Sequence, residues 1–178
     1  MKKINEIIIS KNTPLSEVLA LSSPCMCDSC NNGCKHGSGI LIGNDRENIA
    51  KFLKITEKEL DEKYLEETEQ FNKKFQRPKL LRQGKPFGQC VFFDGKGCKV
   101  HEVKPLQCKT AIACKDYGED VSSWFLANNL LDLNDAEAIR QYKQYQDNGG
   151  KIIPGASLEE LFPDKKELKK ILSYEVLK

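Results

Sequence analysis

Residues 25–34 read Cys25-Met26-Cys27-Asp28-Ser29-Cys30-Asn31-Asn32-Gly33-Cys34, so four cysteines lie within ten residues. The other four form a second group within twenty-five residues, namely Cys90, Cys98, Cys108 and Cys114. A core that uses cysteine as a small apolar residue does not produce such grouping. Two clustered sets of thiols therefore indicate either disulfides or a metal centre.

The cellular compartment decides between these two alternatives. The apolar stretch near the start of the chain, around Ile7–Ile9, is shorter than the roughly 7–15 residues of a secretory signal. No run approaches the ~20 apolar residues of a membrane span. We therefore expect a cytoplasmic protein without a membrane partner. Clustered thiols in a reducing compartment favour metal binding over disulfides.

The distribution of charge is more informative than the net charge of +2, which is too small to indicate a nucleic-acid partner. Residues 77–115 carry nine Lys or Arg against two acidic residues, a local charge of +7 that leaves −5 elsewhere. Four thiolates around a divalent metal or a cubane cluster leave a net charge of about −2, which nearby cations offset. The same basic segment is also compatible with a simple solvated face or with docking of an acidic protein partner.

The length of 178 residues is typical of one domain, which buries about 70% of its unfolded surface without covalent staples. We expect a single domain over 1–178, with a metal-binding core at about 25–114 and a helical extension at about 120–178. The predicted fold is mainly α with a small β-hairpin. It is a metal-centred domain with irregular cysteine-rich loops.

Capping residues and apolar spacing predict the individual elements. Helices are expected at 15–21, 45–55, 57–70, 122–131 and 134–149, with short helices after Pro105, Ser157 and Asp164. Loops are expected around the first cysteine group and over 71–89. A β-hairpin is expected over 90–101, with its turn at Gly95-Lys96-Gly97.

All eight cysteines are candidate metal ligands. The Cys27-x2-Cys30 pair can present two sulfurs to one metal from a tight turn, and the predicted hairpin brings Cys90 and Cys98 together. Eight thiols can close two structural zinc sites or hold one or two cubane clusters, so the spacing alone leaves the metal open. His36 and His101 also lie near cysteines, where they can act as ligands, thiolate partners or ordinary polar residues.

The two cysteine motifs resemble those of the YkgJ-like cysteine-cluster proteins, whose signature is Cys-x2-Cys-x2-Cys-Cys followed by a distal cysteine block. Cys27, Cys30 and Cys34 match three of the four proximal cysteines, and Gly33 takes the place of the third. The distal match runs from Cys90 through Gly97-Cys98 and Pro105 to Cys108. The similarity covers about residues 25–110.

The resemblance implies a zinc- or iron-chelating domain. A related motif occurs in flagellin lysine N-methylases, where an iron–sulfur cluster is implied, and this favours an iron–sulfur cluster, 4Fe-4S, over zinc. The methyl-transfer chemistry does not carry over, because the chain shows no methyl-donor site. We expect a role in electron transfer, redox sensing or assistance to an enzyme system. The alternatives are a structural zinc module that binds a protein partner and an enzyme that uses the cluster directly.

Overall fold

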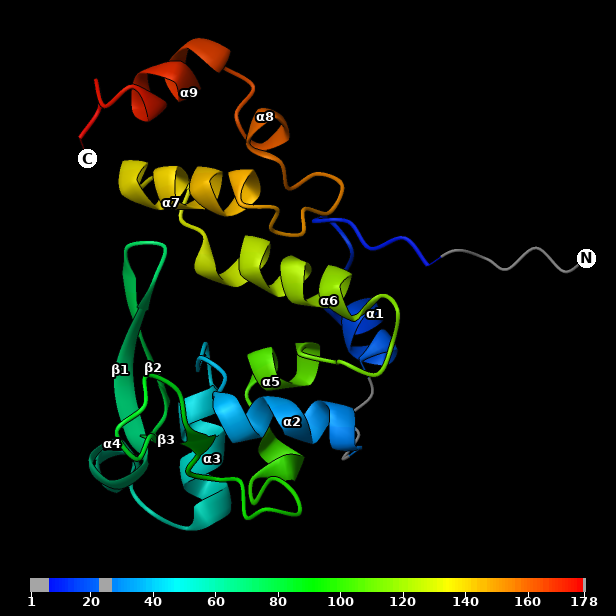
Figure 1. The fold of residues 1–178 in the computed structure, drawn as a ribbon, viewed down its shortest axis with the longest axis vertical. Coiled ribbons are helices and arrows are strands. Elements are labelled where there is room, and N and C mark those ends of the chain that lie inside the picture. The colour runs from blue at the N-terminus through cyan, green and yellow to red at the C-terminus, as the bar shows by residue number, and fades with distance from the viewer. Residues whose placement is uncertain (1–6, 23–26, 178) are drawn as a thin grey trace, which may run out of the picture.

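The computed structural model describes residues 7–22 and 27–177, and helices dominate this part of the chain (Figure 1). The α-helices are α1 (Leu15–Leu21), α2 (Asp28–His36), α3 (Asp45–Leu53), α4 (Glu57–Tyr64), α5 (Leu106–Thr110), α6 (Gly118–Phe125), α7 (Ala136–Asp147), α8 (Leu158–Leu161) and α9 (Lys165–Leu172). A 3-10 helix, η1 (His101–Val103), and a π-helical turn, η2 (Leu126–Leu130), add to them. Two antiparallel strand pairs complete the fold: β1 (Leu65–Gln70) with β2 (Lys73–Pro78), and β3 (Leu80–Leu81) with β4 (Gln89–Cys90). The expected mainly helical class is confirmed.

The β1–β2 hairpin corrects two predictions, because its residues were expected to be the end of a helix and a loop. The strands pair from Leu65 opposite Pro78 to Gln70 opposite Lys73. The turn residues Phe71 and Asn72 both adopt positive φ, at 47° and 59°, which matches a two-residue hairpin turn. Charged residues in these strands suit a helix surface equally well, so tertiary pairing overrides local propensity here.

A salt-bridge network fastens this hairpin to the chain that follows it. Glu66 lies opposite Arg77, whose Nε donates to the carboxylate at 2.9 Å, and Arg82 donates to the same carboxylate. The Arg82 hydrogen bond, with a smaller contribution from Arg77, lowers the pKa of Glu66 to about 2. The network therefore holds β1 and β2 against the segment that leads to β4 and Cys90.

The tip of the hairpin reaches α7 (Figure 1). The buried Phe71 ring lies edge-on to Tyr142, with ring centroids 5.7 Å apart. Asn72 donates to the Asp135 carboxylate at 2.8 Å. These contacts connect the hairpin to the C-terminal helices.

Helix α2 replaces the loop expected around the first cysteine group. Cys27 is the N-cap residue in extended conformation, Asp28 lies in the first turn, and Lys35 and His36 lie in the last. This order of charges suits the helix dipole, which favours anions at the N-terminus and cations at the C-terminus. The helix puts Cys30 and Cys34 on successive turns of one face.

The segment expected to form a hairpin around Gly95 has its turn but not its strands. Asp94 Oδ1 accepts hydrogen bonds of 2.9 Å from the N–H groups of Lys96 and Gly97. One bridge pairs Phe93 with Cys98. Cys90 instead enters a short strand pair in which it lies opposite Leu80.

The helix predicted at 15–21 is present with these bounds, and the other remaining predicted helices are present with shifted ends. The capping boxes at Thr56 and Ser157 form as expected, and Asp164 caps α9. Asp135, rather than Asn134, caps α7. Helices α6 and α7 pack above α5 in Figure 1 and supply much of the larger hydrophobic cluster. No helix among the described residues is long and apolar enough to cross a membrane.

Candidate metal centre

Four cysteines from four separate segments, together with Cys30, line one cavity of about 280 Å³. We call them the inner cysteines: Cys34 in the last turn of α2, Cys90 in β4, Cys98 after the Asp94 turn, and Cys108 in α5. Cys90 is buried and belongs to the smaller hydrophobic cluster, whereas the other three are partly buried. Both sequence groups therefore contribute thiols to the same cavity, as the sequence predicts for a shared centre.

Polar contacts between distant segments fix the helices that carry these thiols. The Asp45 carboxylate at the start of α3 accepts hydrogen bonds from the N–H groups of Ile42 at 3.0 Å and Leu106 at 3.1 Å. The side-chain oxygen of Gln107 accepts from the N–H of Ile40. These bonds place α5, and with it Cys108, against the segment that follows α2.

Gly39 lies directly against Cys108. A Cβ atom at this position would be 2.5 Å from Cys108 Sγ and 3.2 Å from its backbone N. The absence of a side chain at Gly39 therefore sets how close the backbone can come to this sulfur.

Backbone amides lower the pKa of three of the inner thiols: those of Phe92 and Phe93 act on Cys90, that of Val100 on Cys98, and that of Gly39 on Cys108. Amides placed in this way favour the thiolate, which is the form that binds metal. Turns that direct amides at cysteine sulfurs are therefore suited to hold metal ligands.

Burial works against the thiolate at the same positions. Loss of water contact raises the pKa of Cys90 and of Cys108 to about 12. Burial also raises the pKa of Cys34, while the positive charge of Lys104 acts in the opposite direction. The inner thiols raise one another's pKa by like-charge repulsion. All four can be thiolates together only where a bound cation compensates their charge.

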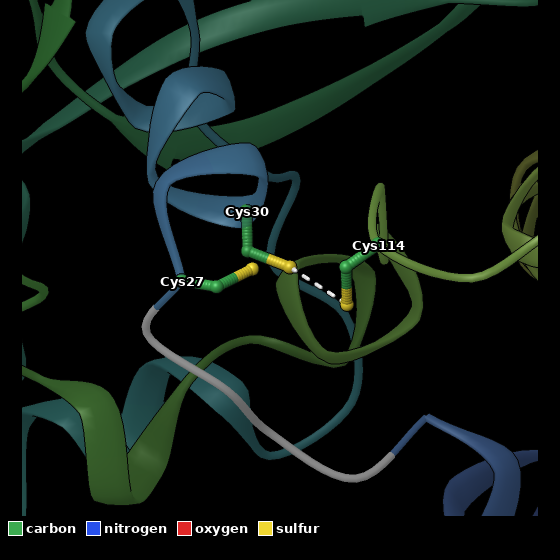
Figure 2. Close-up of side chains that lie close together, drawn as sticks. All are labelled: Cys27, Cys30 and Cys114. Atoms are coloured by element: carbon green, nitrogen blue, oxygen red, sulfur yellow. Dashed lines mark hydrogen bonds between the residues drawn. The ribbon is translucent and has the colours of Figure 1, made fainter.

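A second set of three cysteines, which we call the outer cysteines, lies close together (Figure 2), and one of them, Cys30, also lines this cavity. Cys27 and Cys30 come from the start of α2, and Cys114 from the segment between α5 and α6. Their sulfurs all lie within 4.8 Å of one another, and the Sγ atoms of Cys30 and Cys114 are 3.8 Å apart. Among the described residues this is the only group of three or more candidate ligand atoms that meets this spacing, and the inner cysteines form no such group.

The structure thus distributes seven of the predicted ligands over two sets. Cys25 lies outside the described residues, and its role stays a prediction.

The two histidines near the cysteines have other surroundings. His36 packs edge-on against the Phe87 ring. The Nδ1 atom of His101 is buried and has no hydrogen-bond partner among the residues that the structure describes, and His101 does not line the inner cavity.

Sequence reasoning missed the residues that support the inner cysteines, namely Gly39, Asp45 and Gln107. Each acts through a partner on a distant segment, and a local motif carries no signal of such contacts. Only the cysteines themselves have a spacing that can be read from the sequence.

Comparisons with curated proteins and with solved structures found no match. A family model matches residues 26–145, and its description ascribes zinc or iron chelation to a domain with the CxxCxxCC motif. The match includes all seven described cysteines and covers more than half of the chain. Metal chelation by cysteines, zinc or iron, agrees with the sulfur groups found here. The chain therefore belongs to the CxxCxxCC family of zinc- or iron-chelating domains, as its two cysteine motifs suggest.

Proposed function

We propose that the inner cysteines hold an iron–sulfur cluster of the 4Fe-4S type and that the protein serves in electron transfer. The convergence of four thiols from four segments around one cavity carries this proposal. A cubane cluster takes one cysteine at each of its four irons, so the four thiols supply its complete protein ligand set.

The spacing of the inner sulfurs favours a cluster over a single ion. Four sulfurs on one zinc ion lie about 3.8 Å apart, since each Zn–S bond is about 2.3 Å and the geometry is tetrahedral. Cysteines that bind separate irons of a cubane lie farther apart. The inner sulfurs surround a cavity without forming a close group, which supports the larger inorganic core.

The charges around the cavity suit an anionic centre. Lys104 and Lys109 line it, and they offset the net charge of about −2 of four thiolates on a cubane core. Amide hydrogen bonds to the sulfurs are among the factors that set the reduction potential of such clusters.

A cluster whose irons all have cysteine ligands offers no position for substrate, which favours electron transfer over direct catalysis. The basic segment over 77–115 suits an acidic redox partner protein.

Anaerobic purification tests this proposal. We expect a coloured protein with about four iron and four acid-labile sulfide per chain, the stoichiometry of one cubane. Reduction with dithionite should bleach the colour and produce a paramagnetic resonance signal. A colourless protein with zinc and no sulfide would contradict the proposal and would support a structural zinc module.

The substitution Gly39→Ala tests the support of Cys108. The new methyl group would meet Cys108 Sγ at 2.5 Å and push the sulfur from its place. We expect a loss of about 10–100-fold in metal affinity, the range typical of groups that orient ligands. The measurement is iron content after competition with a chelator.

Gly37→Ala is the matched control for this experiment. A Cβ at Gly37 would meet only the carbonyl oxygen of Gly33, at 3.9 Å. It should keep wild-type iron content. Equal iron retention by both variants would show that Gly39 does not position the sulfur.

A further inference from the structure

The outer cysteines come together from two distant segments at the start of α2 (Figure 2). Cys27 and Cys114 are exposed and Cys30 is partly buried. Their three sulfurs lie within 4.8 Å of one another, from positions up to 87 residues apart in the sequence. Convergence over this separation requires α5 and the segment after it to pack beside α2.

The sulfur spacing indicates the size of the group that these thiols would bind. The distance of 3.8 Å between the Sγ atoms of Cys30 and Cys114 equals the separation of about 3.8 Å that tetrahedral Zn–S bonds of about 2.3 Å impose. A cubane cluster would need wider spacing, since each cysteine binds its own iron. The outer cysteines therefore fit one metal ion.

We propose that the outer cysteines form a second metal centre, which binds a single tetrahedral divalent ion such as Zn²⁺ and is separate from the inner centre. Helix α2 serves both centres, with Cys30 directed at the outer ion and Cys34 at the inner cavity, one turn later. The distal segment divides in the same way between Cys108 and Cys114. Because Cys30 also lines the inner cavity, the two centres are neighbours.

The exposure of the outer cysteines distinguishes the two centres in solution. Chelators and competing ions can reach Cys27 and Cys114 directly, whereas Cys90 of the inner set is buried. The ion at the outer cysteines should therefore exchange with ions in solution before the metal at the inner cysteines does. This inference does not depend on the inner centre being an iron–sulfur cluster.

Cobalt substitution on the full-length protein tests the second centre. The anaerobically isolated protein is treated briefly with a chelator and then titrated with Co²⁺, while iron and sulfide are followed separately. We expect one Co²⁺ per chain, with the absorption bands of tetrahedral cobalt–thiolate coordination and with iron and sulfide unchanged. Zn²⁺ should displace the cobalt, because it has the higher affinity for a tetrahedral thiolate site.

Variants show which cysteines bind the ion. Cys27→Ser and Cys114→Ser should each weaken Co²⁺ binding by at least about 100-fold, because each removes a direct ligand, and both should keep the iron, because neither side chain lines the inner cavity. Ala113→Ser, an exposed neighbour of Cys114, is the control and should bind cobalt like the wild type.

Three results would overturn the second centre. The first is a wild-type protein without cobalt–thiolate absorption, and the second is cobalt binding that survives both cysteine substitutions. The third is loss of iron together with cobalt in Cys114→Ser, which would indicate one shared centre. Circular dichroism shows whether a variant has lost its fold. If a variant does not fold, zinc-edge X-ray absorption of the wild type tests the second centre instead, and we expect at least three sulfur neighbours around the zinc ion. Cobalt binding in a protein without iron or sulfide would instead contradict the proposed function alone.

Discussion

Cys108→Ser is expected to abolish iron and sulfide binding by the inner centre. The side chain lies in α5 at the inner cavity, where Gly39 and the other inner cysteines surround its sulfur. A serine hydroxyl is a poor ligand for iron, and the remaining three thiols would hold an incomplete cluster. Iron and sulfide analysis of anaerobically purified variant should give values near background.

The same substitution should also lower stability. A metal that binds only to the folded state increases the free energy of unfolding. Because cysteine-bound metals contribute strongly in small domains, we expect a loss on the order of 5 kcal/mol, a large fraction of the total stability of an ordinary domain. Urea unfolding under anaerobic conditions measures this loss.

Cys34→Ser and Cys114→Ser separate a ligand effect from a folding effect. Cys34 belongs to the inner set but lies at the end of α2, on a different element from Cys108. Its serine variant should lose iron as completely as Cys108→Ser does. Cys114→Ser should keep the iron. Wild-type iron content in both inner variants would contradict the assignment of these thiols.

Removal of the metal should make stability depend strongly on alkaline pH. In the metal-free protein, burial raises the pKa of Cys90 and Cys108 from 9.0 to about 12. The folded state then keeps these protons while the unfolded state loses them. The stabilisation is therefore fully present below about pH 9 and is lost as pH rises towards about 12.

Urea midpoints of metal-free and metal-bound protein, kept under reductant, measure this difference. Each thiol that ionises only on unfolding lowers the unfolding free energy by about 1.4 kcal/mol per pH unit. The metal-bound protein should lack this decline, because its thiols are already thiolates. Parallel pH profiles for the two forms would show that these thiols are not metal ligands.

Local signals in the sequence account for part of this fold. The capping boxes at Thr56 and Ser157 predict where α4 and α8 begin, because each depends on residues three apart. The β1–β2 hairpin could not be predicted in this way. Its pairing depends on contacts such as Glu66 with two arginines and Phe71 with Tyr142, which join distant parts of the chain.

The candidate site shows the same limit. Cysteine spacing predicts thiols that meet, and cysteines of both sequence groups line the inner cavity. The division into inner and outer sets follows from α2, which places Cys30 and Cys34 on one face but beside different partners. Because the composition of 25–34 is typical of a loop, that helix was not expected.

Anomalous diffraction at the iron edge, from crystals grown anaerobically, tests the central claim most directly. We predict iron atoms within the cavity between Cys34, Cys90, Cys98 and Cys108, each bound to one of these sulfurs. Iron located elsewhere, or the same four sulfurs joined as disulfides around an empty cavity, would contradict the account.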